Sequence, residues 1–202
     1  MRRKLGKYYI YNTITLDNLR YFRRVTYYIG IEFVLTGGMA VQAYLYSNGI
    51  HPSRATGDLD IIIDKEDKEK FLTKLLPTMK GVDVKYRKTK IIDSVLIYFP
   101  RGPYFSISFT DKLPLKTEVN VKTVTIPVEL LEYLLANKIR TYLLRREDRD
   151  VIDILDLVKL LFLGRYKVDS QVFQNALEFY SLNLEDIPEK IREIIATVPQ
   201  VR

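Results

Sequence analysis

The chain has 202 residues but no cysteine and a single histidine, His51. Without cysteine, a disulfide framework, a thiolate zinc site and a cysteine nucleophile are all excluded. One histidine cannot build a metal site with several imidazole ligands, and His51, which precedes Pro52 in an expected loop, is predicted to be a surface or structural residue. Any catalytic metal ion would need carboxylate ligands, which suit hard cations such as Mg2+.

Long apolar segments are also missing. No apolar run approaches the roughly 20 residues of a membrane-spanning helix, and the basic residues 1–9 lack the apolar core of a signal peptide. The sequence therefore predicts a soluble, cytoplasmic protein that does not bind a membrane. Hydrophobic residues make up 47% and charged residues 28% of the chain, and these values indicate a folded globular protein.

Acidic residues are scarce at the start of the chain. Residues 1–30 contain seven cations and one anion, Asp17, so they hold six of the seven net positive charges. Six of the fifteen tyrosines lie there too. A basic, aromatic surface favours RNA through phosphate contacts and stacked bases, although a solvated helix face with tyrosines packed on the core fits equally well. The seven cations are Arg2, Arg3, Lys4, Lys7, Arg20, Arg23 and Arg24.

Helices and short strands alternate up to about residue 127, and nearly everything after it has a helical pattern. The expected strands are residues 32–36, 58–63, 82–86, 95–99, 104–110 and 122–126, with a hairpin turn at 100–103. The expected helices are residues 16–30, 39–47, 67–79, 128–144, 149–163, 170–181 and 186–198. This order predicts an α+β fold: a small mixed sheet with flanking helices over 1–127, and a helical C-terminal region packed on it over 128–202.

Two aspartates stand out on the expected strand at 58–63. Because strand side chains alternate between faces, Asp58 and Asp60 project to the same side, roughly 6.5–7 Å apart along the backbone. Two carboxylates at that spacing can converge on magnesium ions, while Leu59 and Ile61 anchor the other face in the core. An unpaired acidic pair on a half-buried strand repels, so a cation is expected beside it.

The segment before these aspartates contains phosphate-binding residue types. Gly37 and Gly38 end a strand and open a helix, where backbone N–H groups and the helix dipole attract phosphate and the missing side chains permit a close approach. Arg54 and Thr56 add a guanidinium and a hydroxyl donor. An ordinary turn explains the glycines as well, and Arg54 can equally be a structural counter-ion of Asp58.

Together these motifs resemble the DNA polymerase β-like nucleotidyltransferase superfamily, in which a strand and a Gly-Gly or Gly-Ser turn precede an Asp-x-Asp strand. The form Thr-Gly-Gly-x-Ala at 36–40, followed by Arg-x-Thr-x-Asp-Leu-Asp-Ile at 54–61, is most similar to the AbiEii and MenT toxins. Those toxins also carry a later lysine and an Arg-Asp-x-x-Asp run, matched here by Lys138 and by residues 149–153. The resemblance covers about residues 30–165.

The resemblance implies a nucleotidyltransferase fold and an enzyme that moves a nucleoside monophosphate from an NTP to an acceptor and releases pyrophosphate. It implies that Asp58 and Asp60 are catalytic and hold Mg2+ or Mn2+. The nucleotide-binding residues that it implies are Thr36, Gly37, Gly38, Arg54 and Thr56.

Two residues of the helical region are also implied to be catalytic. Lys138 would neutralise phosphate charge, and Asp150 would orient that lysine or the acceptor. From the residue types alone, Lys138 and Asp150 could instead form a salt bridge between two helices.

The chain departs from the superfamily pattern at a third carboxylate, which is usually the general base on a later strand. The position that we align with it is Ser108, which has no carboxyl group. Asp111 lies three residues on and faces the other way on a regular strand, unless a bulge turns it, and Asp93 on the preceding strand is a poorer candidate.

The function that we expect is a toxin-like nucleotidyltransferase of a toxin–antitoxin pair, with RNA such as the 3′ end of tRNA as acceptor and a cognate antitoxin as partner. The RNA acceptor follows from the resemblance and from the basic N-terminal segment. The alternatives are a catalytically degenerate nucleotide- or RNA-binding module and a component that only binds a partner protein.

Overall fold

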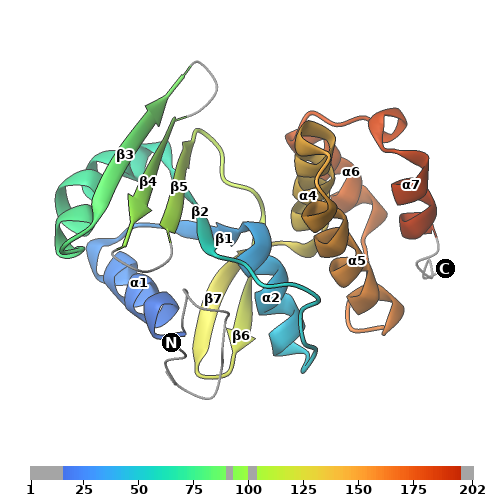
Figure 1. Ribbon diagram of the computed structural model, residues 1–202, viewed down its shortest axis with the longest axis horizontal. Coiled ribbons are helices and arrows are strands. Elements are labelled where there is room, and N and C mark those ends of the chain that lie inside the picture. Colours follow the sequence, from blue (N-terminus) through green and yellow to red (C-terminus); the bar gives the residue numbers. More distant parts are fainter. Residues whose placement is uncertain (1–15, 90–92, 100–103, 197–202) are drawn as a thin grey trace.

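The computed structural model describes residues 16–89, 93–99 and 104–196 of the chain. Its strands are β1 Phe33–Thr36, β2 Asp58–Asp64, β3 Asp83–Lys88, β4 Asp93–Tyr98, β5 Tyr104–Thr110, β6 Lys116–Val121 and β7 Val124–Glu129. Its main helices are α1 Leu16–Ile29, α2 Gly37–Ser47, α4 Leu131–Arg145, α5 Asp148–Phe162, α6 Ser170–Phe179 and α7 Glu189–Ala196. The predicted α+β fold is confirmed: a sheet is followed by a helical part (Figure 1).

All seven strands belong to one mixed sheet in the order β3-β4-β5-β2-β1-β7-β6. The central strand β2 pairs antiparallel with β1 and parallel with β5, and β1 pairs parallel with β7. The aspartate-bearing strand therefore lies in the middle of the sheet, paired on both sides, which holds its backbone rigidly.

One face of the sheet is covered by α1 and by the helical segment at 65–78. The Phe22 ring of α1 makes edge contacts with Phe33 and Phe105, at centroid distances of 5.1 and 6.1 Å. Phe71 of the 65–78 segment contacts Phe109 at 5.5 Å. Because Phe105 pairs with Leu59 in the ladder, this is the face of the apolar β2 side chains, and Asp58 and Asp60 face the other way.

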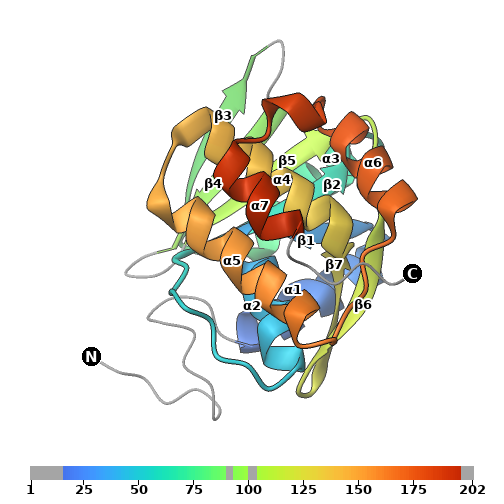
Figure 2. The ribbon, with the colours of Figure 1, turned by 90° about the vertical axis from the view of Figure 1, so that its right-hand side faces the viewer.

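The helical part lies on the aspartate side of the sheet. Helix α2 is buried along 38–45 and contacts β2 as well as α4 and α5, so it joins the sheet to the helices. In Figure 2 helices α4 to α7 stand toward the viewer, with the sheet and then α1 behind them. Within the described parts of the chain, none of the helices is both long and apolar enough to span a bilayer.

Several element boundaries differ from those expected. In place of one strand at 122–126, β6 and β7 form a hairpin whose turn holds Lys122 at a φ of 55°; a lysine is not a recognisable signal for a left-handed residue. Strand β7 runs to Glu129, so α4 starts three residues later than predicted. The expected hairpin turn at 100–103 lies outside the described residues.

The helices predicted at 67–79 and 186–198 also differ from the observed ones. The segment predicted as a helix at 67–79 changes pitch along its length, from a 3₁₀ turn through one α-helical and one π-helical turn to a second 3₁₀ turn that contains Pro77. The helix expected from residue 186 begins only at Glu189, after Pro188 and a 3₁₀ turn at Leu184–Asp186. Proline lacks the N–H that a continuous helix needs.

Candidate active site

Asp58 and Asp60 share one face of β2, as predicted. In the strand pairing Asp58 lies opposite Tyr104 of β5, and Asp60 lies between Thr36 of β1 and Ser106 of β5. Paired residues of neighbouring strands project to the same side of a sheet. The two carboxylates therefore meet the end of β1, where the chain turns into α2.

The two glycines at this turn pack directly against the acidic strand. A Cβ at Gly37 would lie 2.2 Å from Asp60 Oδ2, and one at Gly38 would lie 2.8 Å from both Arg54 Nη2 and Thr56 Oγ1. Gly37 also has a φ of +70°, a backbone conformation that favours glycine. The glycines thus bring the start of α2 onto the carboxylates, and the contact with Asp60 is a reason for Gly37 that sequence reasoning did not supply.

We predict that Gly37→Ala lowers the free energy of unfolding by about 2 kcal/mol or more, because strained φ and a Cβ overlap with Asp60 add together. Chemical denaturation at pH 7 measures this loss. Gly49→Ala is the matched control: it has the same left-handed φ but open space around its Cβ. An equal loss in both variants would show that the Asp60 contact adds nothing.

Asp58 is held by two hydroxyl groups. Thr56 Oγ1 donates to its Oδ1 at 2.6 Å, and Tyr104 Oη donates to its Oδ2 at 2.8 Å. Burial by itself raises the pKa of Asp58, but these two hydrogen bonds and the Arg54 charge outweigh it and lower the pKa below its ordinary value. Asp58 is therefore an anion at neutral pH.

Asp60 has the opposite electrostatics. Burial, followed by the charge of Asp58, raises the pKa of Asp60 to about 6, while Lys138, a hydrogen bond from Ser106 and the Arg145 charge partly offset the rise. An acid destabilised by a neighbouring acid is a place where a cation is bound favourably.

The donor set fits a magnesium ion. Both ligands are carboxylates, and Mg2+ is typically bound by one or two carboxylates with substrate phosphates and water completing its shell. Among the described residues there is no group of three or more acidic or histidine side chains that could hold a metal by itself. The site therefore suits a metal that arrives with, or is completed by, a phosphorylated substrate.

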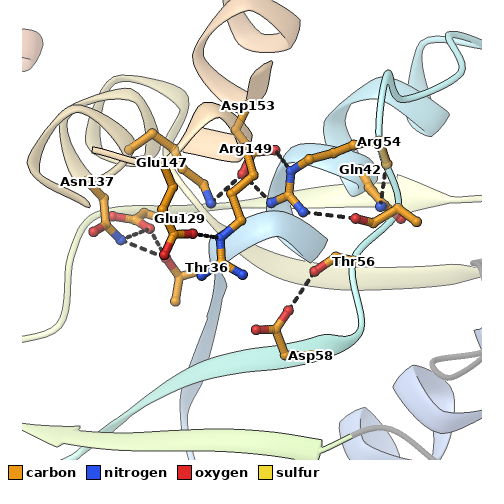
Figure 3. Close-up of polar contacts among 12 residues, drawn as sticks. Thr36, Gln42, Arg54, Thr56, Asp58, Glu129, Asn137, Glu147, Arg149 and Asp153 are labelled. Carbon is orange, nitrogen blue, oxygen red and sulfur yellow. Dashed lines mark hydrogen bonds and ion pairs between the residues drawn. The ribbon is translucent and has the colours of Figure 1, made fainter. Parts of the chain in front are cut away.

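Asp153 of α5 joins the helical part to the loop before β2. Its carboxylate accepts two hydrogen bonds from the Arg54 guanidinium, each 2.6 Å (Figure 3). It also forms an ion pair of 2.6 Å with Lys138 Nζ of α4. Asp153 and Lys138 are buried, with 2% and 5% of their surfaces exposed. The expected pairing of Lys138 with Asp150 is thus replaced by a pairing with Asp153.

Lys138 nevertheless acts on the acidic pair, because its charge lowers the pKa of Asp60. Arg54 bonds to Asp153 and to the Ala55 carbonyl, and its charge lowers the pKa of Asp58 without a direct hydrogen bond to it. Lys138 therefore forms a buried salt bridge with Asp153, and its charge also favours the ionised form of Asp60; its role toward a phosphate stays a prediction.

Asp150 lies at the start of α5 and is 2% exposed. Its Oδ2 is one of two buried side-chain atoms of the described residues without a hydrogen-bond partner. Burial raises the pKa of Asp150, against the charges of Arg145, Lys138 and Arg149. The charges of Lys138 and Arg145 also lower the pKa of Asp60, so the same two cations act on both carboxyl groups.

Another buried acid, Glu129 at the end of β7, fixes the residue before the glycines. Its carboxylate accepts hydrogen bonds from Thr36, Asn137 and Tyr180. The Thr36 hydroxyl is therefore not used to cap α2, although Thr36 is the N-cap residue. The first-turn N–H groups of α2 have no side-chain cap from it and can serve a phosphate.

The candidates for the third carboxylate do not reach this site. Ser108 pairs with Ile62, whereas the neighbours of the two aspartates on β5 are Tyr104 and Ser106. The two acidic candidates are held elsewhere by lysines of the 65–70 segment: Asp111 accepts from Lys65 at 2.8 Å, and Asp93 accepts from Lys68 at 2.5 Å. Neither acid replaces the missing one.

Several residues of this site were not predicted. Tyr104 was found only through its place beside Asp58 in the sheet. Asp153 and Asp156 were missed although the spacing 150, 153 and 156 marks one face of a helix; Asp156 accepts two bonds from Ser53, at 2.8 and 2.5 Å. Arg149 extends from the start of α5 toward the strand that carries Asp58, next to its ion-pair partner Glu147 (Figure 3).

The described cations of the N-terminal segment lie on α1, away from the carboxylates. Arg20 donates to Thr123 Oγ1 at 2.7 Å, Arg23 pairs with Glu118 at 3.3 Å, and Arg24 lies over the Tyr28 ring. His51 is exposed and contacts the Tyr46 ring edge-on. The other four predicted cations, Arg2, Arg3, Lys4 and Lys7, lie outside the described residues.

Comparison with known proteins identifies the family of the chain. Residues 22–197 match the model of the family described as nucleotidyl transferase AbiEii toxin of a type IV toxin–antitoxin system. No curated protein sequence matches the chain.

Solved structures with similar folds include two adenylyl-transfer proteins. The lincosamide antibiotic adenylyltransferase LnuA with lincomycin bound has a TM-score of 0.52 and 19% identity, over 72% of this chain and 98% of that one. ANT(2″)-Ia in complex with adenylyl-2″-tobramycin has a TM-score of 0.57 and 9% identity, over 82% and 96%. The MenT4 nucleotidyltransferase toxin of Mycobacterium tuberculosis is matched at a TM-score of 0.37 and 11% identity, over 84% and 85%. The first two likenesses show the nucleotidyltransferase fold.

Proposed function

This chain belongs to the AbiEii family of nucleotidyltransferase toxins, and we propose that it transfers a nucleoside monophosphate from an NTP to the 3′ hydroxyl of an RNA such as tRNA. The observation that carries the proposal is the packing of Asp60 beneath Gly37. This contact supports the proposal because it brings the two carboxylates of β2 to the N-terminus of a helix whose N-cap hydroxyl is used elsewhere. The family also implies a cognate antitoxin as a partner.

In the proposed complex Asp58 and Asp60 would hold Mg2+ or Mn2+ beside the triphosphate of the NTP. The ion supplies charge neutralisation for the phosphates and activation of the acceptor oxygen. Thr56 and Tyr104 fix the rotamer of Asp58 through their hydrogen bonds. Thr36, Gly37 and Gly38 present the free N–H groups of α2 to the phosphates.

Lys138 and Arg54 supply positive charge opposite the carboxylates. Both are held by Asp153, so their positions are set before the nucleotide arrives and cost little reorganisation. In the transfer step a bond forms between the acceptor oxygen and the α-phosphorus. The bond between the α-phosphorus and the oxygen that bridges the α- and β-phosphates breaks, and pyrophosphate is released.

Asp150 is the proposed acceptor of the proton that leaves the acceptor hydroxyl. Its Oδ2 has no partner within the described structure, and burial raises its pKa above that of an ordinary carboxyl group, which makes the carboxylate a stronger base. This role supplies the acid that the superfamily usually places on the strand corresponding to β5.

Incubation of the protein with each α-labelled NTP, Mg2+ and total RNA tests the proposal. We expect label on RNA with at least one NTP. Label on a small molecule or on protein, with none on RNA, would overturn the RNA acceptor. No product at all from any acceptor fraction would favour the degenerate binding module.

Lys138→Met should lower the transfer rate about 100-fold, since one preorganised charge at the phosphates is lost. Lys167→Met is the control, because this substitution removes the same charge from an exposed residue on the loop before α6. Single-turnover labelling compares the two. If both variants kept the wild-type rate, Lys138 would have only its salt-bridge role.

A further inference from the structure

A cationic groove lies on α1. It has a volume of about 360 Å3 and is formed by one face of α1 and the turn between β6 and β7. Its lining includes Arg20, Arg23, Arg24, Tyr27, Tyr28 and Thr123. The site already described uses none of them.

The groove combines two kinds of contact. Tyr27 and Tyr28 are 74% and 73% exposed, so these rings are not part of the core, in contrast to one of the alternatives expected from the sequence. The two rings meet edge-on at 6.0 Å, and the Arg24 guanidinium lies 5.8 Å from the Tyr28 ring centre. Exposed aromatic faces beside guanidinium groups suit stacked bases and phosphates together.

The groove lies on the opposite face of the sheet from the catalytic carboxylates. Helix α1 packs through Phe22 on the face of Leu59, whereas Asp58 and Asp60 project to the other face. The helix itself is about 10 Å thick, and the sheet adds to this separation. A ligand that touches both the groove and the carboxylates must therefore pass around the sheet.

We propose that this groove binds the body of a folded RNA whose 3′ end occupies the catalytic face. The inference rests on the proposed function for the identity of the acceptor, and it adds where the RNA is held and how large it must be. Glu118, which pairs with Arg23, is the acidic group facing the groove cations from β6. The hydroxyl of Thr123 adds a donor at the edge.

The test compares the binding and labelling of bulk tRNA with those of a trinucleotide that has the same 3′ end. In Arg20→Gln/Arg23→Gln/Arg24→Gln we expect about tenfold or greater weakening of tRNA binding, by fluorescence anisotropy. The slope of log binding constant against log salt concentration should become shallower by about 0.7–0.9 for each phosphate that the variant no longer neutralises. Labelling of the trinucleotide and NTP binding should be unchanged, because the trinucleotide cannot span both faces.

A second variant separates stacking from charge. Tyr27→Ala/Tyr28→Ala should weaken tRNA binding by about tenfold with little change of salt slope. Lys159→Gln/Arg165→Gln/Lys167→Gln removes three exposed charges from the helical part and serves as the charge-matched control; it should bind tRNA like the wild type.

The outcomes separate the two proposals. Loss of tRNA affinity confined to the groove variants supports the groove even if no NTP is transferred, since binding is measured without turnover. Wild-type affinity and slope in the triple groove variant would overturn it, and so would equal losses in the groove and control variants. Groove variants that bind tRNA normally but no longer bind the antitoxin would assign the surface to a protein and likewise overturn it.

Discussion

Asp60→Asn should abolish nucleotide transfer, with a loss of at least about 1,000-fold, and yet stabilise the folded protein. The loss follows from the removal of a metal-binding charge, because metal stabilisation of phosphate charge is worth several kcal/mol and each 1.36 kcal/mol is tenfold in rate. Single-turnover labelling of RNA measures it. Labelling that survived in Asp60→Asn would exclude metal-dependent transfer at this site.

The gain in stability depends on pH. Since the folded-state pKa of Asp60 is raised from its ordinary 3.8 to about 6, the stability that its protonated form contributes is present below pH 4 and is lost as the pH rises through 6. At pH 8 without Mg2+, Asp60→Asn should therefore be more stable than the wild type by about 2–3 kcal/mol. The difference should vanish near pH 4.

Urea denaturation at pH 8 and pH 4.5, with EDTA and then with Mg2+, checks this linkage. Added Mg2+ should stabilise the wild type and have little effect on Asp60→Asn, because binding to the folded state alone shifts the unfolding equilibrium. A variant less stable than the wild type at pH 8 would show that Asp60 has a structural partner that outweighs the repulsion from Asp58.

Asp153→Ala should cause the largest loss of stability of any substitution considered, about 3–5 kcal/mol. The substitution leaves the Arg54 guanidinium and the buried Lys138 amine without their common carboxylate, and an unpaired buried charge costs that much. For a chain of this length the expected fall in Tm is about 10 °C. Transfer should fall as well, because both cations lose their fixed positions.

Asp156→Ala is the matched comparison, three residues along the same face of α5. Its bonds go to the backbone and hydroxyl of Ser53, which are neutral groups, so we expect a loss of only about 1–3 kcal/mol. If Asp153→Ala cost no more than Asp156→Ala, the shared ion pair would not be a main link between the helical part and the loop before β2.

The partner of Lys138 could not be predicted from the sequence. Asp150 and Asp153 are three residues apart, so both lie on the same face of α5. Sequence spacing cannot decide which of the two meets Lys138, because that depends on how α4 packs against α5. The packing selects Asp153 for Lys138 and leaves Asp150 Oδ2 without a partner.

The position of the third carboxylate is a similar case. Choosing Ser108 required knowledge of how β5 pairs with β2, and the observed pairing places Ser106 beside Asp60. A shift of two residues preserves the face on which side chains lie. The alternation of side chains within β5 therefore fits Ser106 and Ser108 equally well as the neighbour of Asp60. Only the pairing of β5 with β2, two strands over 40 residues apart in the chain, selects Ser106.

The sequence by itself determined the features that depend on local order. It placed Asp58 and Asp60 on one face through the period of a strand, put the glycines at the start of a helix, and excluded thiolate and multi-histidine metal sites by composition. The tertiary structure alone decided that Tyr104 holds Asp58, that Asp153 joins Arg54 to Lys138, and that the α1 groove lies across the sheet from the carboxylates. These contacts join segments far apart in the chain, and their geometry comes from strand pairing and helix packing, which no local pattern specifies.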